Sequence, residues 1–147
     1  MKKKDSLKKI LKMLKDLTAD ELDSNGVIPL QEISKELERC IQPERAIPAI
    51  FETMERLQAS DLGAPGPLVH ALEEMSPDYI PELIKSIKRR PTYHTIWMLN
   101  RILNTKLPAQ ERKEFLDLLK ACLEHPKAAK DAKQEAREFI AYQKQNS

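Results

Sequence analysis

The chain has 147 residues, of which 33% are charged and 41% apolar, and its net charge at pH 7 is +2. These proportions are typical of one soluble globular domain and exclude a wholly disordered chain. No apolar run approaches the roughly 20 residues that a membrane-spanning helix needs. The lysine-rich start is followed by an amphipathic stretch, unlike a secretion signal. We therefore expect a cytoplasmic protein with no membrane partner.

Apolar residues recur at helical spacing along most of the chain. The first helix is predicted at about residues 4–17, and Asp23-Ser24-Asn25-Gly26 then forms a turn. Several later helices are expected to begin at a proline, because proline costs little in the first turn of a helix. They are predicted near residues 29–41, 43–59, 65–75, 77–90, 92–105, 108–124 and 127–144. With no competing strand pattern, the fold class is all-α with about eight helices.

Two segments of the chain repeat one pattern 33 positions apart. Ala46-Ile47-Pro48-Ala49-Ile50-Phe51-x-x-Met54 aligns with Tyr79-Ile80-Pro81-Glu82-Leu83-Ile84-x-x-Ile87. A helix pair cannot bury its apolar face alone, so such a period is typical of stacked helix pairs. We predict a single domain over residues 1–147, a short HEAT-like α-solenoid of antiparallel helices. Residues 1–42 would form N-terminal cap helices, residues 43–124 degenerate repeats, and residues 125–147 a C-terminal cap helix.

The residues that usually carry catalysis or bind metals are poorly arranged in this sequence. Cys40 and Cys122 lie in helical patterns and are interpreted as buried thiols. His70, His94 and His125 have no His or Cys at the spacing of a zinc pair. No Gly-x-Ser-x-Gly motif is present. The sequence therefore predicts neither an enzyme nor a metal site, and no cofactor.

Two segments concentrate special residues. Asp61 to Glu73 contains two glycines and two prolines before a helix that would present His70 and Glu73 one turn apart. In the second segment, 91–104, Trp97, Asn100, Arg101 and Asn104 follow i, i+3, i+4, i+7 spacing. These side chains could belong to the core and join neighbouring helices. Alternatively they line a binding face, because Tyr, Trp and Arg dominate the energetics of interfaces.

These same two segments resemble a known family. Gly-x-Pro-Gly-Pro-Leu-Val-His-x-Leu-Glu, followed by Pro-Thr-x-x-Thr-x-Trp-Met-Leu-Asn-Arg-Ile-Leu-Asn, is similar to the HEAT-like immunity proteins. Those small bacterial proteins are encoded beside polymorphic or contact-dependent growth-inhibition toxins. The resemblance covers residues 43–105. It implies a cytoplasmic inhibitor that binds one cognate toxin domain, and it transfers no binding residue.

Charge is unevenly distributed along the chain. Residues 1–15 carry seven lysines and one aspartate, residues 16–82 four basic and fifteen acidic residues, and residues 83–147 fourteen basic and seven acidic residues. The acidic middle, with a net charge of −11, would attract a basic protein such as a nuclease. Glu32 and Glu36 are expected to contribute to it. The predicted partner-binding residues are Glu52, Glu55, Asp61, His70, Glu73, Glu74, Asp78, Tyr93, Trp97 and Arg101.

The basic ends of the chain favour a rival interpretation. A helical adaptor or nucleic-acid-binding scaffold would contact phosphates with basic residues near one end and elsewhere in the chain: Lys2, Lys3, Lys4, Lys8, Lys9 and Lys12, and Lys85, Lys88, Arg89 and Arg90. Few aromatic residues are available for stacking on bases, and the acidic middle would repel a polyanion. A nucleic-acid partner is therefore the weaker expectation. A helical-repeat DNA glycosylase, which needs a base-sized aromatic cleft, is weaker still.

Overall fold

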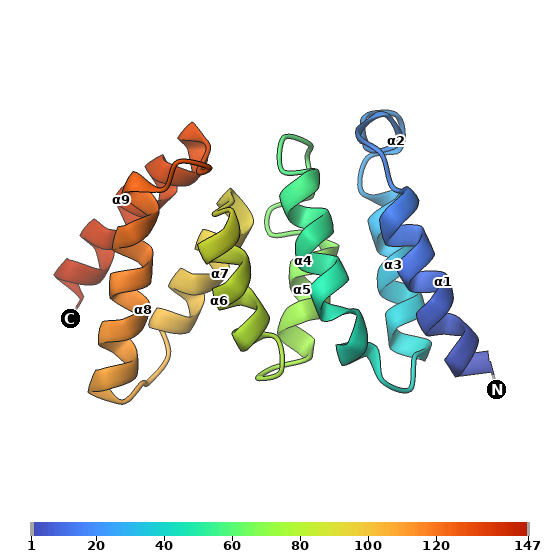
Figure 1. Cartoon of the computed structure of the whole chain (residues 1–147), viewed down its shortest axis with the longest axis horizontal. Helices are drawn as coiled ribbons and strands as arrows, with labels where there is room; N and C mark the ends of the chain where they lie inside the picture. Colours follow the sequence, from blue (N-terminus) through green and yellow to red (C-terminus); the bar gives the residue numbers. More distant parts are fainter. Residues whose placement is uncertain (1, 147) are drawn as a thin grey trace. The chain divides into compact units, whose positions relative to one another are not determined.

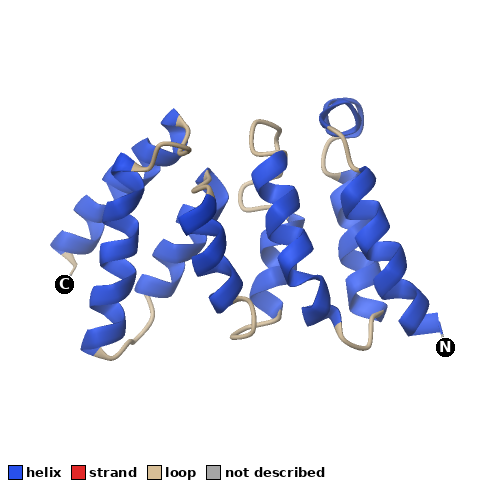
Figure 2. Ribbon diagram, in the orientation of Figure 1, coloured by secondary structure: helices blue, strands red, loops and turns tan. Residues whose placement is uncertain are grey.

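The computed structural model describes residues 2–146, with side chains from residue 6 to residue 146. Within that range the chain forms nine α-helices and two short 3₁₀ turns, and the described residues contain no strand (Figure 2). None of the described helices is both long enough and apolar enough to cross a bilayer. The helices divide into two compact units, residues 1–82 and residues 83–147.

The first unit is built around α1 and α3, which run antiparallel and pack closely (Figure 1). Helix α5 packs on α3, and α4 packs on α1. Fully buried apolar side chains fill the space between these helices, among them Ile10, Leu30, Ile50, Phe51 and Leu72. The elements are α1 (Lys2–Asp16), α2 (Ala19–Asn25), α3 (Ile28–Arg39), a 3₁₀ turn (Pro43–Ala46), α4 (Ile47–Arg56) and α5 (Pro67–Glu74).

A short glycine-containing loop leads into α5. Gly63 and Gly66 have φ values of +96° and +98°, a region that favours glycine. A Cβ atom at Gly66 would overlap the backbone carbonyl of Leu62. The loop therefore needs glycine at this position for two reasons, the backbone angle and the close approach of two chain segments.

The second unit contains α7 (Tyr93–Leu103), α8 (Ala109–Ala121), a 3₁₀ turn (Cys122–Glu124) and α9 (Lys130–Gln145). Helix α6 (Ile80–Arg89) begins in the first unit and ends in the second. Helix α7 packs on both α8 and α9. Thr92 and Thr95 form a reciprocal capping box at the start of α7, which satisfies two backbone N–H groups there.

A polar network joins α7, α8 and α9. Gln143 is 2% exposed, and its Nε2 donates to Asn100 Oδ1 at 2.8 Å and to Asn104 Oδ1 at 2.9 Å. Arg112 donates from Nη2 to Gln143 Oε1 at 2.9 Å and from Nη1 to the carbonyl of Leu103 at 2.9 Å. Each buried amide thus has a partner, as burial of polar groups requires.

The predicted all-α class is confirmed, while the helix count and several boundaries differ from the prediction. Helix α2 was missed because its seven residues contain one buried side chain, Leu22, and show no periodicity. Pro48 and Pro81 are each the second residue of their helix, so both copies of the repeated pattern start a helix in the same way. The division into two compact units falls within α6.

Candidate partner-binding surfaces

Most of the predicted acidic contacts lie in the first unit and are exposed. Glu52 lies on α4, Glu74 ends α5, and Asp61 and Asp78 lie in the loops on either side of α5. His70 is exposed on α5. Asp61 accepts a hydrogen bond from the N–H of Gly63 at 2.9 Å. Glu52, Asp61, Glu74 and Asp78 form no ion pair with another described residue, so their charges face solvent.

Three acidic residues do not match the surface role expected from the sequence. Glu55 is only 8% exposed, and it interacts within the chain. Glu73 is half-buried and also has an interaction within the chain. Glu36 pairs with Lys9 at 3.2 Å and with Arg39 at 3.6 Å, which offsets its charge. The exposed acidic surface is therefore smaller than the count of acidic residues suggests.

A shallow groove between α3 and α5 brings two carboxylates together. Glu38 and Glu74 line it, and its volume is about 200 Å³. Its other lining residues are mostly apolar: Leu37, Cys40, Pro43, Ala71 and Met75, with Ser34. Glu38 was not among the residues predicted to bind a partner. Only the packing of α3 on α5 reveals it, because residues 38 and 74 share no motif or spacing.

The second unit carries a ridge of larger side chains along α7. Tyr93, Trp97 and Arg101 follow one another at i, i+4, i+8, which places them on one side of the helix. Tyr93 and Trp97 are half-buried and Arg101 is exposed. The Arg101 guanidinium carbon lies 4.9 Å from the centre of the Trp97 ring, within cation–π range. The Tyr93 ring meets the His94 ring edge-on, at 5.4 Å between centroids.

The predicted polar and aromatic stripe on α7 separates into two parts. Asn100 and Asn104 bind Gln143 and belong to the network inside the second unit. Trp97 and Arg101 remain at the surface, and Trp97 is not a fully buried core residue. The structure thus assigns a packing role to the asparagines. Tyr93, Trp97 and Arg101 form the ridge on the other part of the stripe.

The described residues contain no group of three or more His, Cys, Asp or Glu side chains that could hold a metal ion. Cys122 is 2% exposed, and burial raises the pKa of its thiol from 9.0 to about 11. Its Sγ donates to the Leu118 carbonyl at 3.4 Å. Such a thiol is a poor nucleophile at neutral pH.

His125 accepts the Lys127 N–H at Nδ1, at 3.0 Å, and its Nε2 lies 2.7 Å from the Lys88 carbonyl. This histidine therefore joins α6 to the loop before α9.

Comparisons with protein-family models, curated proteins and solved structures found no match to this chain. The likeness to HEAT-like immunity proteins therefore depends on the two quoted segments alone. Those segments contain the α5 loop, with Gly63 and Gly66, and helix α7.

Proposed function

We propose that this protein is a cytoplasmic inhibitor of the immunity type, which binds a basic toxin domain and neutralises it. The observation that carries the proposal is the set of exposed carboxylates in the first unit. Among them, Glu38 and Glu74 line an apolar groove. Glu52 and Asp78 are two further exposed carboxylates of the same unit. A basic protein surface, such as the substrate-binding cleft of a nuclease, complements these groups.

The composition of the α3–α5 groove suits a protein partner. Stable interfaces have an apolar centre and a polar rim, and charged groups at the rim steer the partner and fix its register. The groove is lined by the buried Leu37 and Ala71 and the half-buried Met75, and by the exposed Glu38 and Glu74. Inhibition would follow from covering the toxin's cleft, and no bond is made or broken by the inhibitor.

The proposal includes the HEAT-like arrangement predicted from the sequence. Its support is the repeated pattern in which Pro48 and Pro81 each take the second position of a helix. Helix pairs repeated in this way present an extended surface of a kind that commonly grips another macromolecule. Small-angle X-ray scattering would test the arrangement, because a solenoid and two freely hinged units give different distance distributions.

A nucleic-acid-binding scaffold remains the second candidate. Residues 83–147 carry a net charge of +7, and the ridge on α7 contains two aromatic rings, those of Tyr93 and Trp97. Bases could stack on those rings while lysines contact phosphates. The side chains of Lys2, Lys3 and Lys4, expected from the sequence to take part, lie outside the described residues. An electrophoretic mobility-shift assay with single-stranded and duplex oligonucleotides separates this candidate from the inhibitor.

Growth rescue tests the inhibitor most simply. The proposal requires a toxin domain encoded beside this gene, and that domain is expressed from an inducible promoter, with and without the protein. We expect wild-type protein to restore growth and Glu38→Lys/Glu74→Lys to lose that protection. The matched control is Glu111→Lys/Glu124→Lys, which makes the same change in net charge at exposed positions of the second unit. The proposal fails if wild-type protein gives no rescue, or if both variants rescue equally.

A further inference from the structure

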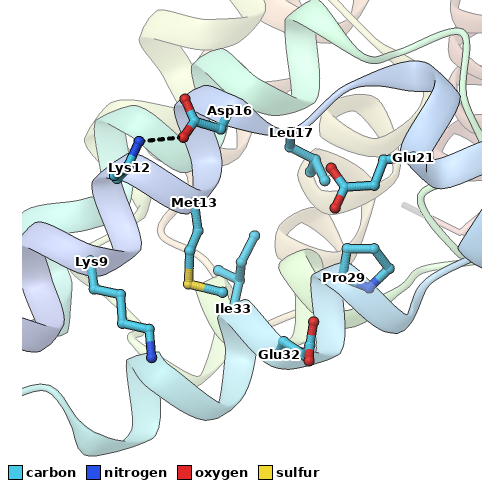
Figure 3. Close-up of a pocket in the computed structure, with 9 residues that line it drawn as sticks. All are labelled: Lys9, Lys12, Met13, Asp16, Leu17, Glu21, Pro29, Glu32 and Ile33. Carbon is cyan, nitrogen blue, oxygen red and sulfur yellow. Dashed lines mark hydrogen bonds and ion pairs between the residues drawn. The ribbon is translucent and has the colours of Figure 1, made fainter.

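A second cavity lies among α1, α2 and α3 in the first unit. Its volume is about 370 Å³, which gives room for one extended side chain but is at the small end of ligand sites. Figure 3 shows Met13 and Ile33 at its centre, with Leu17 and Pro29 toward the end near α2. These four side chains make a mostly apolar floor, and both α1 and α2 pack on α3 around it.

The charged groups around this cavity are arranged unevenly. Lys9 and Lys12 lie at one end, and Glu21 and Glu32 lie at the other, near Pro29 (Figure 3). Both lysines already have partners. Lys12 donates to Asp16 at 2.7 Å, and Lys9 donates to Glu36 at 3.2 Å.

The hydrogen bond between Lys12 and Asp16 affects both groups. It raises the pKa of Lys12 and lowers the pKa of Asp16, so both stay charged and paired at neutral pH. By contrast, Glu21 and Glu32 are exposed and form no ion pair with another described residue. The charged groups at the cavity that form no ion pair with a described residue are therefore the carboxylates of Glu21 and Glu32, which lie beside its apolar surface.

We infer that this cavity receives an arginine side chain of the basic partner, with its stem on Met13 and Ile33 and its guanidinium against Glu21 and Glu32. An arginine stem covers apolar surface while its charged end stays near water. The planar guanidinium presents several N–H donors and can bind two carboxylates at once, which the compact ammonium of lysine does less well. The assignment rests on the proposed function for the origin of the arginine, but its chemistry is independent of any toxin.

Two capped tripeptides, Gly-Arg-Gly and Gly-citrulline-Gly, test that chemistry. Citrulline has the same stem and shape as arginine but a neutral end. Binding to the full-length protein is followed by the ¹H–¹³C methyl signals of Met13 and Ile33 in NMR titrations. We expect saturable shifts of both methyl signals with the arginine peptide. Its affinity should be about tenfold higher than that of the citrulline peptide, as a charge-assisted bidentate contact implies.

Two variants locate the site. Glu21→Gln/Glu32→Gln removes both charges while keeping side-chain size, and it should lower the affinity for the arginine peptide about tenfold. Glu111→Gln/Glu124→Gln, the matched control in the second unit, should leave the affinity within about twofold, because neither side chain lines the cavity and exposed charges interact weakly through solvent. Circular dichroism confirms that both variants stay helical.

Three results would overturn the assignment. The first is equal affinity for the arginine and citrulline peptides, and the second is unchanged affinity after the Glu21 and Glu32 substitutions. The third is binding of free n-butylguanidinium without binding of the arginine peptide, which would make the cavity a site for small cations. Growth rescue by a protein that fails these peptide tests would leave the inhibitor role standing and refute the arginine site alone.

Discussion

Arg56 holds the end of α1 from a distant part of the first unit. Its Nη1 donates to the Leu17 carbonyl and its Nη2 to the Leu14 carbonyl, both at 2.8 Å. The last carbonyl groups of a helix lack partners within the helix, so a guanidinium that binds two of them caps α1 and attaches it to α4.

Replacing Arg56 by alanine should therefore lower the free energy of unfolding by about 1 to 2 kcal/mol, the usual loss for hydrogen bonds from a charged donor. Urea denaturation followed by circular dichroism measures it. Arg45→Ala is the control, because Arg45 is exposed in the 3₁₀ turn and should change stability by less than about 0.5 kcal/mol. Equal losses in the two variants would contradict the capping role.

Cys122 gives a pH-dependent prediction. Burial raises the pKa of its thiol from 9.0 to about 11, so the folded protein keeps the proton where the unfolded chain loses it. The stabilising contribution is fully present below pH 9 and is lost as the pH rises from 9 toward 11. Stability should therefore fall more steeply over this range in wild type than in Cys122→Ala, measured by urea denaturation at each pH. Parallel slopes would contradict it.

The raised pKa of the Cys122 thiol also predicts slow alkylation of this residue in the folded protein. In a Cys40→Ser background at pH 8, iodoacetamide should modify the folded protein about a hundredfold more slowly than the urea-unfolded chain, because the thiolate is the reactive form. Mass spectrometry of quenched samples measures both rates. Comparable rates would show that the thiol is more accessible than its 2% exposure indicates.

The close packing of the loop that leads into α5 is tested by comparing alanine substitutions at Gly66, in that loop, and at Gly26, which follows α2. Gly26 and Gly66 both have positive φ, so alanine at either should cost about 1 to 3 kcal/mol in backbone strain. A Cβ at Gly66 also overlaps the Leu62 carbonyl, whereas nothing lies within 4 Å of a Cβ at Gly26. Thermal unfolding should therefore show a larger loss for Gly66→Ala. A smaller loss at Gly66 than at Gly26 would mean that this loop adapts freely.

The sequence predicts the longer helices. It does not predict the short helix α2 or the burial of Glu55 on α4. The periodic apolar stripe identified α1 to within two residues. Helices α4 and α6 begin four and three residues after the starts predicted at Pro43 and Pro77, and Pro43 begins a 3₁₀ turn instead. Helix α2 begins at a recognisable N-cap, where Thr18 Oγ1 accepts the Glu21 N–H at 3.1 Å. Its short length removed the periodic signal. Glu55 was placed at the surface because spacing along one helix cannot show how many neighbours cover it.

Only part of the candidate binding surface followed from sequence. Charge counts located the acidic segment, and helical spacing placed Trp97 and Arg101 together. Glu38 and Glu74 share a groove only because α3 packs on α5, a contact between residues far apart in the chain. In the same way, Gln143 on α9 takes Asn100 and Asn104 out of the predicted stripe. Pairing between distant helices was the missing information in both cases.

At the scale of the whole molecule, the account depends on a division of charge. The first unit, residues 1–82, has a net charge of −5, because the −11 of residues 16–82 is partly offset by the +6 of residues 1–15, and the second unit, residues 83–147, has a net charge of +7. A basic partner should therefore bind the first unit, and its affinity should fall as salt screens the charges. A neutral partner would show neither effect, and an acidic partner would bind the second unit instead.

Isothermal titration calorimetry of the protein with the basic toxin domain that the proposal requires tests this claim most directly. We expect Glu38→Lys/Glu74→Lys to weaken binding by about a hundredfold or more, because reversed charges face a basic surface. Glu111→Lys/Glu124→Lys should change the affinity by less than about threefold, since neither residue lines the groove and exposed charges interact weakly through solvent. Equal weakening by the two variants, or no weakening by either, would contradict binding through the acidic groove.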